Sequence, residues 1–186
     1  MNARLKLSDS LNLIKSFKTS GTITPSSKVL IKTLLAPIDF TSARCLIELG
    51  PGTGCVTRSI LERMHPDCIL ICFEVNGDFI DQLEALQDSR LRVVNACASS
   101  IRSILDDLDV EEVDHIVSSL PLALIDNEVV KKILESVRSN LRAGGRFLQF
   151  QYSLSNYAEL KPIFKSVKLD FTFRNMPPAF VYECTK

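Results

Sequence analysis

From Arg44 onward, short apolar runs alternate with segments that have the periodicity of an amphipathic helix, and this alternation limits the possible folds more than any other feature. Strands separated by helices of about ten residues form βαβ units around a parallel sheet. We therefore expect an α/β chain with a three-layer α-β-α architecture. The predicted strands lie at 45–49, 68–74, 90–96, 113–119 and 146–152, and the predicted helices lie at 53–64, 77–87, 99–108 and 127–141.

The end of the chain departs from this alternation. A short helical stretch at 155–164 is followed by two further predicted strands, 168–175 and 180–184, with only a proline-containing segment between them. A parallel crossover needs about a dozen residues or more, so these two strands are expected to form an antiparallel hairpin at the edge of the sheet. The sequence thus predicts a mostly parallel seven-stranded sheet with a C-terminal antiparallel hairpin.

The N-terminal segment has helical patterns of its own. Residues 5–18 place apolar side chains on one broad face, with cations beside it. Such a helix can lie in the headgroup layer of a membrane, or the same face can pack against the protein, and periodicity leaves both open. A second helix is predicted over 26–35, because Thr24 before Pro25 is typical of a helix start. We expect residues 1–39 to form this helical segment and 40–186 to form the main domain.

Charge and cysteine content argue against several classes of function. The chain carries 22 basic and 22 acidic residues, whereas a dedicated nucleic-acid binder usually has a basic excess. No stretch approaches the ~18 consecutive apolar residues of a membrane span. The six cysteines form no CxxC pair and the two histidines lie far apart, so no metal site is expected and reduced thiols in the cytoplasm are the simplest interpretation. We interpret His115, inside a strand, as a core residue rather than a catalytic group.

A glycine-rich turn follows the first predicted strand, in the sequence Glu48-Leu49-Gly50-Pro51-Gly52-Thr53-Gly54. Ligands of doubly wound folds bind at the carboxyl ends of the strands, where such a turn lets the backbone approach them. The spacing differs from the dinucleotide fingerprint GxGxxG, because Cys55 occupies the position of its last glycine. Glu74 ends the second predicted strand and is well placed to accept hydrogen bonds from two ribose hydroxyls.

The glycine turn with its preceding acid, the strand-end acid Glu74, the turn Ala143-Gly144-Gly145 and the terminal hairpin together resemble the Rossmann-like S-adenosylmethionine-dependent methyltransferases. The resemblance covers residues 40–186 and implies S-adenosylmethionine as the cofactor. It implies that the glycine turn passes close to the methionine and ribose parts of the cofactor. In this family pattern Glu48 orients the turn and Glu74 binds the ribose. Carried over by position, the cofactor-binding residues are Glu48, Gly50, Pro51, Gly52, Thr53, Gly54, Glu74, Val75, Asn76, Ala96, Cys97, Ser118, Leu120 and Pro121.

Two positions depart from the patterns of this family. Ala96 stands where an aspartate commonly holds the adenine amino group, so either a backbone group or the side chain of Asn95 or Ser99 substitutes, or the adenine pocket is weaker. After the fourth predicted strand, methyltransferases acting on adenine amino groups have Asn or Asp, then Pro, then an aromatic residue. Here Ser118 and Leu122 replace the first and last of these. An enzyme similar to the rRNA adenine-N6 dimethyltransferases, or another amine N-methyltransferase, is therefore the alternative interpretation rather than the first.

The bacterial phospholipid N-methyltransferases are more similar. The resemblance rests on Phe-Leu-Gln-Phe-Gln-Tyr at 147–152, the Ser-x-Leu-Pro loop at 118–121, the segment 175–182 and the N-terminal residues 16–27. It implies N-methylation of the amine headgroup of phosphatidylethanolamine or ornithine lipid. It also implies peripheral association with an anionic membrane surface through residues 1–20, at the cytoplasmic face of the inner membrane. Tyr152 is the candidate catalytic residue, either as proton acceptor or by cation–π contact with the methylated product.

Overall fold

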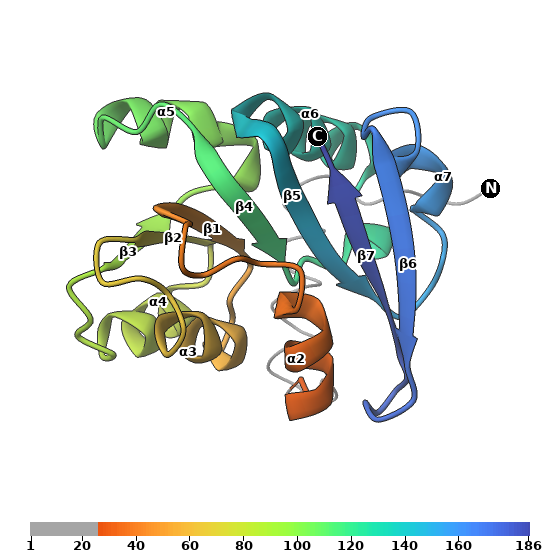
Figure 1. The fold of residues 1–186 in the computed structure, drawn as a ribbon, viewed down its shortest axis with the longest axis horizontal. Coiled ribbons are helices and arrows are strands. Elements are labelled where there is room, and N and C mark those ends of the chain that lie inside the picture. The colour runs from red at the N-terminus through yellow and green to blue at the C-terminus, as the bar shows by residue number, and fades with distance from the viewer. Residues whose placement is uncertain (1–25) are drawn as a thin grey trace.

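A computed structural model describes residues 26–186, and the predicted helix at 5–18 lies outside these residues. Seven strands form one sheet in the order β3-β2-β1-β4-β5-β7-β6 (Figure 1). Neighbours from β3 to β5 pair in parallel, whereas β7 is antiparallel to both β5 and β6, so the predicted fold and its terminal hairpin are confirmed. The strands are β1 (Cys45–Leu49), β2 (Ile69–Glu74), β3 (Leu91–Asn95), β4 (Val113–Ser118), β5 (Leu141–Gln151), β6 (Ser166–Thr172) and β7 (Ala179–Thr185).

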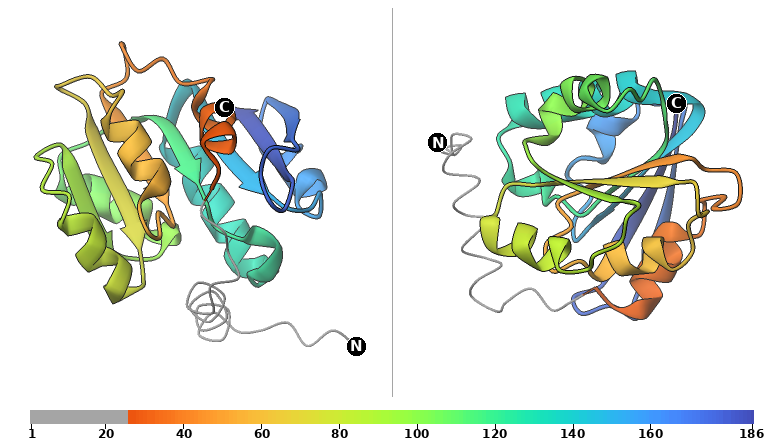
Figure 2. Two further views of the ribbon diagram at one scale, coloured as in Figure 1. Left: turned by 90° about the horizontal axis from the view of Figure 1, so that it is seen from below. Right: turned by 90° about the vertical axis from the view of Figure 1, so that its left-hand side faces the viewer.

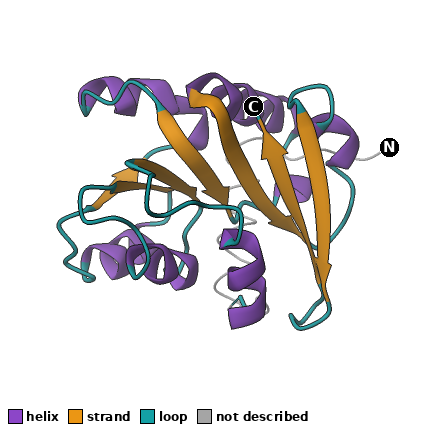
Figure 3. Ribbon diagram, in the orientation of Figure 1, coloured by secondary structure: helices purple, strands orange, loops and turns teal. Residues whose placement is uncertain are grey.

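Helices cover both faces of the sheet (Figure 3). Every residue of β1 is buried, as expected for a central parallel strand, and successive side chains point to opposite faces. Ile47 packs in one core with α5 and α6, while Leu46 packs in a second core with α2 and α3. The helices are α2 (Lys28–Leu35), α3 (Cys55–Leu61), α4 (Gly77–Glu84), α5 (Ile101–Asp107), α6 (Asn127–Asn140) and α7 (Tyr157–Leu160), with short 3-10 turns η1 (Ala98–Ser100) and η2 (Leu122–Leu124).

Helix α2 lies beside β5, β7 and β6 (Figure 2). Its N-cap is Ser27 rather than Thr24, because the Ser27 hydroxyl accepts a hydrogen bond from the Leu30 N–H at 3.1 Å. The Ser27 N–H in turn donates to Asn175 Oδ1 at 2.9 Å. Residue 175 belongs to the turn between β6 and β7, so this bond joins the start of α2 to the terminal hairpin.

The predicted turn Ala143-Gly144-Gly145 lies inside β5 instead of ahead of it. Strand β5 begins at Leu141, directly after α6, and its pairing with β4 shifts register between Val113 and His115. Gly144 has φ +72°, and a Cβ on Gly145 would lie 2.8 Å from the Asp114 carbonyl oxygen. The glycines therefore form an irregularity in one strand rather than a link between a helix and a strand.

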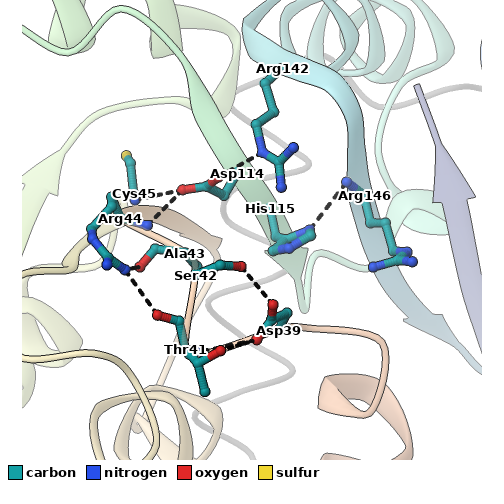
Figure 4. Close-up of polar contacts among 10 residues, drawn as sticks. All are labelled: Asp39, Thr41, Ser42, Ala43, Arg44, Cys45, Asp114, His115, Arg142 and Arg146. Atoms are coloured by element: carbon teal, nitrogen blue, oxygen red, sulfur yellow. Dashed lines mark hydrogen bonds and ion pairs between the residues drawn. The ribbon is translucent and has the colours of Figure 1, made fainter.

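Polar contacts close the edge of the sheet at which β1 and β4 begin (Figure 4). Asp114 Oδ2 accepts from the backbone N–H groups of Arg44 and Cys45 at 2.7 and 3.0 Å, and Asp114 Oδ1 accepts from Arg142 Nε at 2.6 Å. Nearby, hydroxyl donors of the following loop lower the pKa of Asp39 to about 2. The opposite edge, where the parallel strands end, carries the predicted site. Among residues 26–186, no helix is both long and apolar enough to cross a membrane.

Candidate functional site

The glycine turn begins as an extension of β1, because the Gly50 N–H donates to the Phe73 carbonyl of β2 at 2.9 Å. The chain then enters the left-handed region at Gly50, Gly52 and Gly54, with φ values of +67°, +56° and +78°. Residues with a Cβ rarely adopt this conformation, which explains the spacing of the glycines. Gly54 is also the N-cap of α3, so the turn leads directly from the end of a strand into a helix.

The Ser-x-Leu-Pro loop packs against this turn. A Cβ on Gly50 would lie 2.7 Å from Leu120 Cδ2, so only glycine leaves room for that side chain. The loop is held by the Ser119 N–H, which donates to the Leu49 carbonyl at 2.9 Å, and by Ser118 Oγ, which accepts from the Leu120 N–H at 3.2 Å. The structure thus brings the predicted residues of the first and fourth strands into contact.

Glu74 joins the glycine turn to the second strand. Its Oε2 accepts from the Gly52 N–H at 3.0 Å, and its Oε1 accepts from the N–H groups of Val75 and Asn76 at 2.9 and 3.0 Å. Asn76 caps α4 by accepting from the Asp78 N–H at 3.0 Å. These contacts fix the carboxylate beside the cradle formed by the turn, where it suits a ligand with vicinal hydroxyls.

Glu48 lies under the turn and is completely buried. The Cys72 thiol of β2 lies 3.6 Å from Glu48 Oε2 and donates to it. Burial, together with the negative charge of Glu48, raises the pKa of the Cys72 thiol well above its usual value. The thiol therefore stays protonated and serves as a donor inside the sheet, rather than as a nucleophile.

The loop after β3 contains the predicted adenine position. Ala96 and Cys97 are half-buried, and Ala96 packs against the core that includes α5 and α6. The Cys97 carbonyl accepts from the N–H and hydroxyl of Ser100 at 3.0 and 2.7 Å, which starts η1. Asn95 and Ser99 are exposed on this loop, so both side chains can offer the polar group that Ala96 lacks.

Two glutamines of β5 support the Ser-x-Leu-Pro loop, and the residue predictions did not include them. Gln149 Nε2 and Gln151 Nε2 donate to the Leu120 carbonyl at 3.0 and 3.1 Å. Both side chains are buried, and Gln149 Oε1 has no hydrogen-bond partner among residues 26–186. The signal that could have identified them is their alternate spacing in an otherwise apolar strand, which places both on one face.

Tyr152 directly follows β5 at this edge of the sheet and is 41% exposed. Its ring lies edge-on to Phe150, with centroids 5.9 Å apart. Burial raises the pKa of the Tyr152 phenol, and a hydrogen bond with the Asn175 amide opposes this only in part. The phenol is therefore protonated at neutral pH, and it can donate or accept a hydrogen bond but is not a phenolate base.

Other candidate groups lie outside this edge. Tyr182 is buried, its hydroxyl donates to the Ser153 carbonyl at 2.9 Å, and burial raises its pKa to about 12, so it is a packing residue. His115 is also buried, and its Nδ1 accepts from the Arg146 N–H at 3.2 Å, as expected for a core histidine. Within residues 26–186, no three His, Cys, Asp or Glu side chains gather in a group able to hold a metal ion.

Known proteins resemble the chain in sequence and in fold. No protein-family model matches it. It is 32% identical over 167 residues to the ornithine lipid N-methyltransferase of Singulisphaera acidiphila, across 88% of this chain and 87% of the relative.

Solved structures share the fold at lower identity. The 1,6-didemethyltoxoflavin-N1-methyltransferase of Burkholderia thailandensis, with bound S-adenosylhomocysteine, has a TM-score of 0.73 at 15% identity, over 100% of this chain and 91% of that chain. The precorrin-6y C5,15-methyltransferase of Geobacter metallireducens has a TM-score of 0.69 at 14% identity, over 86% and 90% of the two chains.

The glycine turn and Glu74 fit the cofactor of these enzymes, because they pair a strand-to-helix turn at the carboxyl end of β1 with a fixed carboxylate that can accept from ribose hydroxyls. Identity of 32% over most of both chains is enough to establish family membership. The protein therefore belongs to the family of that lipid N-methyltransferase and is a class I S-adenosylmethionine-dependent N-methyltransferase.

Proposed function

We propose that the enzyme N-methylates the amine headgroup of a membrane lipid, either ornithine lipid or phosphatidylethanolamine. The observation that carries the proposal is the 32% identity to an ornithine lipid N-methyltransferase over 88% of this chain. The loop after β4 agrees with it. Ser118 is buried with its oxygen turned to the Leu120 N–H, and Leu122 is buried in the core, so neither is suited to grip an adenine base.

S-adenosylmethionine, when bound, supplies an activated methyl group for an in-line displacement. The protein then mainly has to hold the amine about 3 Å from that methyl group in the correct direction. Glu74 and the glycine turn hold the cofactor, while Leu120, fixed by Gln149 and Gln151, forms the side of the site toward β5. The geometry of the site, rather than a strong base, thus accounts for the catalysis.

Tyr152 is the residue proposed to meet the amine. A protonated ammonium has no lone pair, and desolvation beside a cationic sulfonium favours the neutral amine. The Tyr152 phenol can accept a hydrogen bond from the amine. It can also relay the proton of the amine to water, by donating its own proton as it accepts that one, and the ring can stabilise the methylated cation. Its position at the end of β5, next to the supported loop, is consistent with this role.

The membrane is the proposed location of the substrate. The sequence of residues 5–18 predicts a helix with one apolar face and flanking cations, so residues 1–20 are the segment proposed to contact an anionic bilayer. We place the enzyme at the cytoplasmic face of the inner membrane, where amine headgroups and S-adenosylmethionine meet.

The test is transfer of a labelled methyl group. The full chain is incubated with S-adenosylmethionine labelled on its methyl group, vesicles containing ornithine lipid or phosphatidylethanolamine, and total RNA, and the mixture is extracted with organic solvent. Label in the organic phase, identified by chromatography as a methylated headgroup, is the expected result. Label only in the RNA would refute the lipid assignment and favour the adenine alternative.

A further inference from the structure

Among residues 26–186, eight large apolar side chains are more than a third exposed, and six of them lie at one edge of the sheet; the other two, Val29 and Leu169, lie in α2 and within β6. Leu124 follows β4, Tyr152 and Leu154 follow β5, and Phe171, Phe173 and Met176 lie at the end of β6 or in the turn after it. Strand β6 runs parallel to β5, because β7 is antiparallel to both. All six side chains therefore lie at the edge that holds the glycine turn and Tyr152. Exposed apolar patches mark interaction sites, and here the aromatic side chains of the β6–β7 hairpin contact one another.

The most exposed of these residues are in the turn between β6 and β7, residues 173–178, which we name the hairpin tip. Phe173 and Met176 are each 80% exposed. The Phe171 and Phe173 rings lie 4.5 Å apart, and Phe171 continues the contact to Phe180 at 4.7 Å. The β6–β7 turn projects beyond the rest of the sheet (Figure 1), and the ring contacts continue from Phe180 through Phe171 to Phe173 in this turn.

The hairpin tip has a fixed shape. Asn175, at its centre, is buried, accepts from the Ser27 N–H at 2.9 Å and donates to the Pro177 carbonyl at 2.8 Å. These bonds turn the polar side chain of the tip inward, while Phe173 and Met176 point out, so the exposed apolar pair is part of the fold rather than a consequence of a loose loop.

Positive charge surrounds the tip. Arg174 is the only charged residue among 173–178 and is exposed. Helix α2, whose cap is bonded to the tip, adds the exposed Lys28 and Lys32 and contains no acidic residue. Asp170 alternates with Phe171 along β6 and so lies on the other face of the strand. Apolar residues flanked by cations match the boundary between acyl chains and anionic headgroups.

We propose that the hairpin tip is a bilayer-contacting surface, in which Phe173 and Met176 enter an anionic membrane while Arg174, Lys28 and Lys32 contact its headgroups. This inference rests on the proposed lipid substrate, and it adds a contact separate from residues 1–20. Because Gln151 of β5 pairs with Phe180 of β7, Tyr152 lies beside the base of the tip, and a tip seated in the bilayer brings this candidate catalytic tyrosine toward the headgroups. The acyl chains of the substrate can then stay in the membrane during methyl transfer.

The first experiment uses a tryptophan reporter, because the sequence contains no Trp. Phe173→Trp in the full chain is mixed with vesicles of equal phosphatidylglycerol and phosphatidylethanolamine that carry brominated acyl chains. We expect a blue shift of the emission and strong quenching. The matched control, Arg63→Trp, replaces an exposed residue after α3, near the opposite edge of the sheet, and is expected to show neither.

The second experiment measures vesicle binding by co-sedimentation, with the double variant F173S/M176S and the control Leu169→Ser, a half-exposed residue of the same hairpin away from its tip. We expect roughly tenfold weaker binding for F173S/M176S, near-unchanged binding for the control, and unchanged S-adenosylhomocysteine affinity in both. Unquenched Phe173→Trp together with wild-type binding of F173S/M176S would overturn the proposal. So would a tip that dimerises the protein instead of entering vesicles. Tip-dependent binding without lipid methylation would refute the proposed function alone.

Discussion

Glu74 is the residue that joins the two segments of the proposed cofactor site, because one oxygen accepts from the glycine turn and the other accepts from Val75 and Asn76 at the start of α4. Replacing it by alanine removes the acceptor for ribose hydroxyls and leaves backbone N–H groups without this partner. We expect Glu74→Ala to weaken S-adenosylhomocysteine binding by about 1–3 kcal/mol, the cost of unpaired polar groups in such a site. Isothermal titration calorimetry measures this difference directly.

Glu84→Ala is the matched control for that substitution, since Glu84 is an exposed carboxylate at the end of α4. The affinity of Glu84→Ala for S-adenosylhomocysteine should equal that of the wild type. A thermal melt of Glu74→Ala without ligand separates loss of the ligand contact from loss of the fold. Wild-type affinity in a folded Glu74→Ala protein would show that the ribose is bound elsewhere.

At the scale of the elements, the contact between the glycine turn and the Ser-x-Leu-Pro loop depends on the missing side chain of Gly50. Gly50→Ala places an alanine at a φ of +67°, which is unfavourable for a residue with a Cβ, and puts that Cβ 2.7 Å from Leu120 Cδ2. Gly144→Ala places an alanine at a similar φ of +72°, but its Cβ would have no atom within 4 Å. This variant therefore isolates the conformational cost, about 1–2 kcal/mol.

We expect Gly50→Ala to lower the free energy of unfolding by more than Gly144→Ala does, in urea titrations of the two variants. The added substitution Leu120→Ala should recover part of the difference, because it removes the clash but not the backbone strain. It should not recover cofactor affinity, since Leu120 itself lines the site. Equal destabilisation of the two single variants would show that the loop moves away from Gly50 at little cost.

The elements also show what the sequence could and could not predict. The strand alternation predicted the sheet, and the strand-end rule placed Gly50 and Glu74 at one edge, because both follow from local pattern and chain direction. The support of Leu120 by Gln149 and Gln151 was not predicted, because it depends on pairing between β4 and β5. The glycines of β5 were predicted as a turn for the same reason. That they form an irregular part of a strand depends on the close approach of Gly145 to the Asp114 carbonyl of β4, which the sequence alone does not reveal.

At the scale of the whole molecule, the two edges of the sheet have different chemistry. The edge where the strands begin is closed by Asp114 and its partners, whereas the edge where they end combines the glycine turn with exposed apolar residues. Stability and function are thus placed at opposite edges. It follows that groups of the closed edge and of β4 should control the acid stability of the protein without contacting its ligands.

His115 is the group expected to dominate that stability between pH 6.5 and 4. Burial, helped by the positive charge of Arg146, lowers its pKa from 6.5 to about 4. As the pH falls, the imidazole of His115 is therefore protonated in the unfolded chain before it is protonated in the folded protein. The free energy of unfolding should decrease through this window by roughly 3 kcal/mol in all. The pKa of Asp39 is lowered to about 2, and that of Asp114 is also lowered. These two carboxylates therefore affect stability only in more acidic solution. Urea titrations at pH 7, 6, 5 and 4 measure the effect.

His115→Asn tests the assignment, because an asparagine oxygen can still accept from the Arg146 N–H but cannot titrate. This variant is expected to have lower stability at pH 7 and a flatter dependence on pH between 6.5 and 4. His65→Asn is measured alongside it as the matched substitution at the other histidine, which lies at the surface after α3. If His115→Asn instead kept the full slope, the proton that destabilises the fold would be bound at another group, and the buried histidine would have only a packing role.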